Sequence, residues 1–93
     1  MSMLRFKLLD ADIKMPTRNG EDSAGVDLYS PSLIKIDRQS TEVIDLRLKI
    51  ILPYGTYGQL FGKSSMSTFG LVVNGGVIDR DYEGTFYLLL IFI

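Results

Sequence analysis

The stretch Glu42–Leu52, with the sequence EVIDLRLKIIL, decides the fold class of this chain. Apolar residues occupy every second position, and charged residues lie between them. The apolar face would carry Ile44, Leu46, Leu48 and Ile50, and the polar face Asp45, Arg47 and Lys49. Side chains alternate between the two faces of a strand, whereas a helix repeats about every 3.6 residues. The stretch is therefore predicted to be a β-strand with one buried and one solvated face.

Short apolar runs separated by turn residues extend this pattern along the chain. The clearest turn signals are PTRNGED at 16–22 and PYG at 53–55, because Pro, Asn and Gly favour tight turns. A helical turn capped by a serine is predicted at 64–68. Strands are predicted at residues 4–9, 26–30, 33–37, 42–52, 57–61, 71–73 and 85–93. We therefore predict an all-β jelly roll or sandwich that forms a single domain over residues 1–93.

Composition limits the classes of function. The chain has 93 residues, of which 46% are hydrophobic and 23% charged, and its formal net charge is −1. These values suit one small globular domain, and no basic stripe indicates a nucleic-acid partner. We find neither a signal-peptide core nor an apolar run of the roughly 20 residues that span a membrane. We expect an intracellular protein without a membrane partner, and leave its compartment, cytoplasm or nucleus, open.

The chain contains no cysteine and no histidine. Thiol nucleophiles, disulfides, Cys/His zinc sites and Ser-His-Asp catalysis are therefore excluded. Any catalysis has to use carboxylates, hydroxyls, Lys or Arg, backbone amides, or a hard cation bound through oxygen.

The stretch Gly75–Gly84, GGVIDRDYEG, is the strongest candidate for such chemistry. Asp79 can act as a general base toward a water molecule, and Tyr82 offers a flat face to a sugar or base. Arg80 and Glu83 are predicted to be solvated turn residues without a role. An ordinary hairpin turn between two apolar strands is the alternative interpretation.

Two further stretches carry polar groups of related chemistry. In AGVDLYS, residues 24–30, Asp27 lies between apolar neighbours and offers a magnesium contact through water. A satisfied turn aspartate is the alternative there. In GKSS, residues 62–65, a glycine, a cation and two hydroxyls offer a phosphate grip. The alternative for this stretch is a solvated polar turn.

In this order and spacing, AGVDLYS, GKSS and GGVIDRDYEG resemble the motifs of the trimeric dUTPase family, the dUTP pyrophosphatases. The segments LRFKLLD and PTRNGEDSAG, at residues 4–10 and 16–25, are also similar to the start of such enzymes. The resemblance covers effectively the whole chain. It implies a dUTPase-like jelly roll and a homotrimer whose active sites lie between subunits.

The family's reaction is the hydrolysis of dUTP to dUMP and diphosphate, with Mg²⁺ on the triphosphate. The resemblance implies that Asp79 activates the water that attacks the α-phosphorus, and that Asp27 supports the metal through water. Tyr82 would lie under the deoxyribose and leave no room for a 2′-hydroxyl.

The resemblance also implies how the substrate is held. Phosphates would bind the GKSS segment, and the backbone of a β-hairpin pocket would read the uracil edge. The implied substrate-binding residues are Lys63, Ser64, Ser65, Gly76, Val77, Ile78 and Tyr82.

Two features depart from the family pattern. Lys63 stands where arginine is usual, so the charge is kept but the forked geometry is lost. An Arg-containing strand region and a Gly-rich C-terminal arm are expected downstream, and the sequence ends at Ile93 without them. The jelly roll is therefore predicted to be incomplete, and the run 85–93 to keep an unpaired edge. A truncated product or fragment, a frame-shifted reading and a stripped-down homologue all stay open.

Two other functions stay open. The first is a non-catalytic dUTPase-like module for nucleotide binding or assembly. The second is a deoxynucleotide deaminase of similar fold, against which the hydrolase-type run at 75–82 argues.

Overall fold

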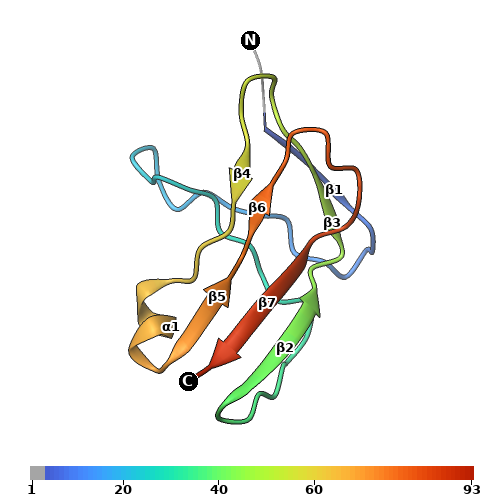
Figure 1. The fold of residues 1–93 in the computed structure, drawn as a ribbon. Helices are drawn as coiled ribbons and strands as arrows, with labels where there is room; N and C mark the ends of the chain where they lie inside the picture. Colours follow the sequence, from blue (N-terminus) through green and yellow to red (C-terminus); the bar gives the residue numbers. More distant parts are fainter. Residues whose placement is uncertain (1–3) are drawn as a thin grey trace.

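The computed structural model describes residues 4–93, so residues 1–3 of the predicted domain lie outside the described part. Within this part the chain forms seven strands and one short helix (Figure 1). In chain order they are β1 (Arg5–Leu8), β2 (Ser40–Asp45), β3 (Leu48–Ile51), β4 (Gly58–Gln59), α1 (Ser64–Thr68), β5 (Leu71–Asn74), β6 (Val77–Ile78) and β7 (Tyr87–Phe92). The predicted all-β fold class is confirmed.

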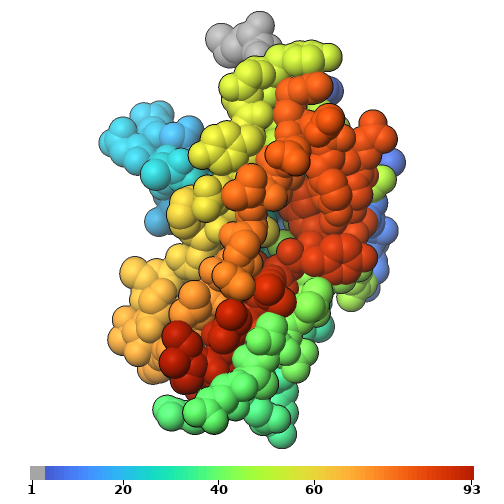
Figure 2. All heavy atoms as spheres, viewed as in Figure 1, coloured from blue at the N-terminus to red at the C-terminus, as the bar shows by residue number. Residues whose placement is uncertain are grey.

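The strands of the described residues form three antiparallel sheets. The largest has the order β2-β7-β5, and the pairs β1–β3 and β4–β6 make the other two. Figures 1 and 2 show β7, in red, running between β5 and β2. Across residues 4–93 these sheets share no strand and do not close into a barrel, which agrees with the predicted incomplete jelly roll.

The prediction that residues 85–93 keep an unpaired edge is wrong for β7. Leu90 has Glu42 as its partner on one side and Val73 on the other. The strand is not fully buried, because Tyr87 is 56% exposed. The two edges of this sheet are β2 and β5 instead.

The predicted strand at 42–52 is in fact two strands in different sheets. β2 pairs with β7, and β3 pairs with β1. Between them Arg47 adopts the left-handed backbone conformation, with φ 52°. The alternation persists across this break, since Ile44, Leu46 and Leu48 are all buried. The predicted faces are therefore confirmed, and the predicted continuity of the strand is wrong.

Polar contacts hold the corner between β2 and β3. The Asp45 Oδ1 accepts a hydrogen bond from the Arg47 N–H at 2.8 Å. The Arg47 guanidinium forms an ion pair with the Asp10 carboxylate. The backbone carbonyl of Arg47 accepts a hydrogen bond from the Leu9 N–H at 3.0 Å. The corner is thus tied to the segment that follows β1.

One hydrophobic cluster joins the sheets. Its buried members come from β2, β3, β6, β7 and the residues beside them. They are Ile44, Leu46, Leu48, Ile78, Phe86 and Leu90. Burial of these side chains is the main stabilising term for a domain of this size.

The segments before β2 correct two strand predictions. Residues 26–30 and 33–37 form no strand, and Asp27 makes only an isolated antiparallel bridge with Thr17. Pro31 removes a backbone donor between the two runs. In the second run Ile34 and Ile36 pack against the core, but neither run pairs with a strand of the described sheets. The helical turn at 64–68 is confirmed as α1.

The predicted serine cap of α1 is wrong. Lys63 is the N-cap residue, and no side chain makes a capping hydrogen bond. Over residues 4–93, no helix is long and apolar enough to cross a membrane.

The Asp10 contacts predict how stability depends on pH. Two hydrogen bonds hold the pKa of the Asp10 carboxyl below its usual 3.8. The bond from the Asp12 N–H has the larger effect, and the bond from the Arg47 guanidinium has the smaller one. A lowered folded-state pKa contributes stability above the unfolded pKa, and this is lost as pH falls through the folded value. Asp10→Asn should therefore lower the free energy of unfolding at pH 6, and the difference from wild type should shrink toward pH 3.

Urea unfolding at both pH values measures this difference. Asp12→Asn is the matched control, because the Asp12 backbone N–H that bonds Asp10 is kept. A difference between wild type and Asp10→Asn that does not change with pH would contradict the assignment.

Candidate functional site

The structure brings two of the three predicted stretches together. The Lys63 Nζ lies 3.3 Å from the Asp27 Oδ2, although the residues are 36 positions apart. The side chains are 64% and 31% exposed, respectively, so the pair faces solvent. The Asp27 backbone is fixed by reciprocal bonds with Thr17, at 2.7 and 3.1 Å. A carboxylate and a cation therefore stand together at a defined place on the surface.

Ser64 and Ser65 lie beside this pair, in the first turn of α1. The Lys63 carbonyl accepts the N–H groups of Met66 and Ser67, at 2.9 and 3.2 Å. The first N–H groups of a helix have no acceptor within it. The two serines thus offer both hydroxyls and amide donors next to the Lys63 ammonium. Such a set of donors suits an anion rather than a cation.

A cavity of about 810 Å³ opens at the Asp27–Lys63 pair. Its deeper wall is apolar and includes core residues from β2 and β7, while its mouth includes the charged pair. Asp79 and Tyr82 do not line it. The cavity therefore belongs to the first two stretches only.

The second part of the third stretch, residues 79–84, forms a turn that is braced by Tyr82. The Tyr82 N–H donates to the Asp79 carbonyl at 3.1 Å, and the Tyr82 hydroxyl donates to the Thr85 carbonyl at 2.8 Å. The Tyr82 ring stacks on Phe86, with centroids 6.3 Å apart. A Cβ at Gly84 would lie 2.4 Å from the Tyr82 hydroxyl, so only glycine leaves room for this arrangement. Asp79 is exposed at the start of the turn.

The hairpin-turn alternative for this stretch is wrong. β6 and β7, which flank the turn, belong to different sheets and are not paired with each other. The space between them is therefore not closed by a ladder of hydrogen bonds. The same observation corrects the expectation of a regular β-hairpin pocket at residues 76–78.

The backbone of β6 has one free edge. The Leu60 N–H donates to the Gly76 carbonyl at 2.9 Å, and Val77 lies opposite Gln59 in the register. Bonded and non-bonded pairs alternate in an antiparallel ladder, so Val77 occupies a non-bonded position. Its N–H and C=O point away from β4 and form an adjacent donor and acceptor.

Gly76 allows this close pairing of β6 with β4. Its φ is 97°, and a Cβ there would lie 3.0 Å from Leu60 atoms. A larger residue would be strained in backbone conformation and would press on β4. The glycine is thus required by the geometry of the strand pair.

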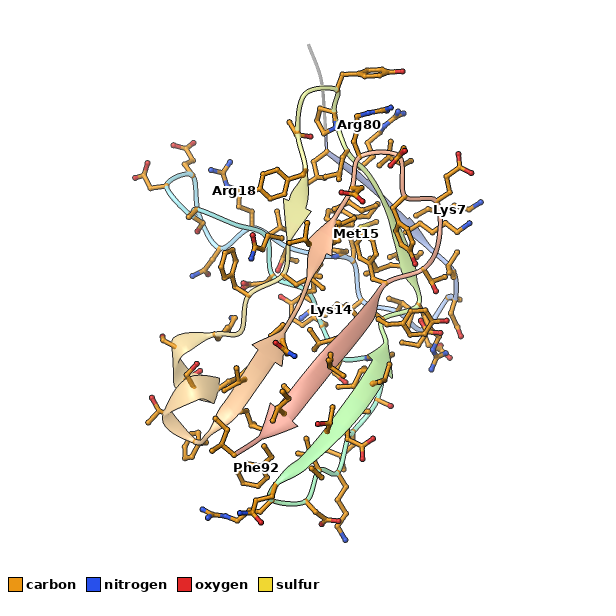
Figure 3. All side chains as sticks on the ribbon, viewed as in Figure 1. Lys7, Lys14, Met15, Arg18, Arg80 and Phe92 are labelled. Atoms are coloured by element: carbon orange, nitrogen blue, oxygen red, sulfur yellow. The ribbon has the colours of Figure 1, made fainter. Side chains whose placement is uncertain are left out.

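The two parts of the site stand apart within one chain. The turn at 79–84 lies at the upper right of Figure 1, where Arg80 is labelled in Figure 3, whereas α1 lies at the lower left. Tyr82 lines a separate hollow of about 430 Å³, which shares no residue with the larger cavity. A single chain therefore does not bring Asp79 to the Asp27–Lys63 pair.

The sequence did not predict one contact of the turn. Arg80 is an exposed turn residue, as predicted, and its guanidinium carbon also lies 4.1 Å from the centroid of the Tyr54 ring. The only signal in the sequence is an arginine in one turn and a tyrosine in another, 26 positions earlier by number. Such a contact between distant turns has no periodic pattern.

The acidic residues do not form a metal site by themselves. Among residues 4–93, no group of three or more His, Cys, Asp or Glu side chains could hold a metal ion. A hard cation takes six or more oxygen ligands in most sites. Asp27 could supply one contact to such an ion, with the others coming from water or a ligand.

Comparison with known proteins identifies the family. A sequence model of the dUTPase family matches residues 11–91. The deoxyuridine 5′-triphosphate nucleotidohydrolase of camelpox virus strain CMS is 34% identical over 90 residues, which are 97% of this chain and 61% of the viral protein. The Pol polyprotein of equine infectious anemia virus strain Wyoming is 42% identical over 64 residues, 69% of this chain and 6% of the polyprotein.

Comparison with solved structures gives the same family. A mutant dUTPase from phage phi11 of S. aureus superposes with a TM-score of 0.89 at 29% identity, over 98% of this chain and 60% of the phage chain. The native dUTPase of equine infectious anemia virus gives a TM-score of 0.85 at 33% identity, over 98% and 72% of the two chains. This chain spans about 60% of the length of the camelpox and phage proteins. Its sequence and its incomplete jelly roll place it in the dUTPase family.

Proposed function

We propose that this chain is a subunit of a dUTP diphosphatase, which hydrolyses dUTP to dUMP and diphosphate. The observation that carries the proposal is the Asp27–Lys63 pair beside the first turn of α1, at 3.3 Å. The pair brings two motifs of the dUTPase family together at one surface, where the neighbouring donors suit an anion. The dUTPase of Staphylococcus bacteriophage 80alpha, which is 30% identical, has been solved with dUpNHpp.

Lys63, Ser64 and Ser65 hold the phosphates in this proposal. The ammonium neutralises charge, and the hydroxyl and amide donors of α1 orient the phosphate oxygens. When the triphosphate arrives, Lys63 exchanges its bond with Asp27 for phosphate oxygens. Asp27 is then left with a free carboxylate.

The freed Asp27 carboxylate fits a role toward Mg²⁺ through water. The phage phi11 dUTPase is described as coordinating a structural Mg(II) ion. Bound Mg²⁺ would neutralise charge on the triphosphate. The rest of its ligands would be triphosphate oxygens and water, since the described acidic residues form no three-membered cluster.

Asp79 is the general base of the proposed reaction. It accepts a proton from a water molecule whose oxygen forms a bond to the α-phosphorus. The bond from the α-phosphorus to the bridging oxygen of the β-phosphate breaks, and diphosphate leaves. No covalent intermediate is needed, which suits a chain without His or Cys.

Base and sugar recognition fall to the third stretch. The free N–H and C=O of Val77, between Gly76 and Ile78, match the adjacent acceptor and donor on the uracil edge. A site built to pair such groups rejects a base that presents the wrong pattern. Tyr82 packs under the deoxyribose, and its half-exposed ring leaves no space for a 2′-hydroxyl.

The separation of the two parts supports a homotrimer with sites between subunits. The phosphate part and the Asp79 part stand apart in one chain, so each site takes one part from each of two neighbouring copies. Side chains around the β4–β6 pair offer an apolar face to a neighbour, because Tyr57, Phe61 and Val77 are 66%, 80% and 63% exposed. A neighbouring copy would bury this face.

Removal of the proposed base should abolish turnover but not binding. Asp79→Asn is expected to lower kcat by about 10²–10⁴-fold, because the water loses its base. Diphosphate release from dUTP with magnesium measures this, and calorimetry with dUpNHpp should give nearly the wild-type Kd. Glu83→Gln, in the same turn, is the matched control with wild-type activity.

Equal release by wild type and Asp79→Asn would contradict catalysis by this chain. If dUpNHpp still binds in that case, the chain is a nucleotide-binding module. If it does not bind at millimolar concentration, both nucleotide functions are wrong.

Mixing two inactive variants tests whether sites are shared. Asp79→Asn and Lys63→Ala damage different parts, so each is expected to be inactive alone. After joint refolding at equal amounts, random trimers should recover about one quarter of the wild-type sites. Sedimentation should show three chains of 10.4 kDa. No recovery from a mixture that does form trimers would show that each site lies within one chain.

A further inference from the structure

The turn that carries Asp79 has a contact outside itself. The guanidinium carbon of Arg80 lies 4.1 Å from the centroid of the Tyr54 ring. Tyr54 belongs to the loop between β3 and β4, and Figure 3 shows Arg80 close to that loop at the upper end of the molecule. The two loops flank β4 and β6, which pair with each other through Gly58 and Ile78, and the contact joins the loops beyond that pairing.

The Tyr54 side of the contact is a closed turn. The N–H and the hydroxyl of Thr56 both donate to the Pro53 carbonyl, at 3.3 and 2.6 Å. Gly55 takes the positive φ of 78° that this turn requires. Tyr54 is 82% exposed, so the turn fixes its backbone while its ring has little other cover.

The Arg80 side lies over a hollow. The segment Arg80–Glu83 lines a space of about 430 Å³ together with Lys7, Lys49 and residues 50–52, at the end of β3. Tyr82 anchors the far end of the turn through Phe86 and the Thr85 carbonyl. The near end, next to Asp79, follows Ile78, which pairs with Gly58 on β4, and the Arg80 contact lies just beyond this pairing.

Charge alone would not fix this end of the turn. Lys7 and Lys49 lie opposite each other across β1 and β3, and Asp81 and Glu83 line the same hollow. Opposite charges at such separations attract without a preferred geometry, and salt screens them. A planar guanidinium over a ring does have a preferred geometry.

We propose that Arg80 is a positioning residue, which holds the Asp79 turn in its productive place by stacking on Tyr54. Arg80 acts through the turn and does not touch the substrate. The catalytic part of this inference rests on the proposed function, whereas the restraint on the turn does not. The opposite assignment is that Arg80 binds the triphosphate directly.

The variants separate these assignments. An exposed contact of this kind is worth about two- to fivefold in an equilibrium. Arg80→Gln and Tyr54→Leu should each raise amide hydrogen exchange at residues 80–82 by that factor and lower kcat similarly, with KM unchanged. In the double variant, hydrogen exchange and kcat should change no more than in either single variant. Tyr54→Phe keeps the ring, so its exchange and kcat should equal those of the wild type.

Three outcomes would overturn the proposal. Unchanged exchange in both single variants would show that the contact does not restrain the turn. Additive effects in the double variant would show that the residues act separately. A rise in KM for Arg80→Gln but not for Tyr54→Leu would make Arg80 a phosphate ligand. If the wild type releases no diphosphate, the proposed function fails, and the exchange data still decide whether Arg80 restrains the turn.

Discussion

The left-handed backbone at Arg47 is the constraint on which the rest of the structure depends. It turns one amphipathic run into two strands that pair in different sheets. An L residue in this conformation costs about 1–2 kcal/mol. The Asp45 side chain and the Asp10 carboxylate, both bonded to Arg47, offset this cost. Without the corner, β3 could not leave β2 to pair with β1, and the two sheets would not cover one core.

The sequence predicted which side chains of the 42–52 run are buried, but it did not predict that the run divides into two strands. Burial alternates through the corner, so the period of two stays visible from Ile44 to Leu48. The corner itself depends on Asp10, which lies 37 positions away. Local pattern carries no information on such a partner. The same reason explains β7, whose two partners come from separate parts of the chain.

The candidate site shows the same division. Motif order identified Asp27, Lys63 and Asp79 as residues of interest, because residue type is enough to recognise their chemistry. Their placement was not predictable, since order along the chain does not give distance. The structure pairs Asp27 with Lys63 and keeps the Asp79 turn away from both. That separation is the basis for the proposed site shared between copies.

Arginine and lysine side chains connect loops of this protein to segments that are distant in the sequence. Arg47 reaches Asp10, Lys63 reaches Asp27, and Arg80 reaches Tyr54. Exposed contacts of this kind are each weak, so the loops are restrained far less firmly than the sheets. Weak restraint suits a site that must exchange partners. In the proposed function, a triphosphate would compete for Lys63 and break this weak ion pair at little cost in free energy. It would thereby release the Asp27 carboxylate for a metal ion bound to the same triphosphate.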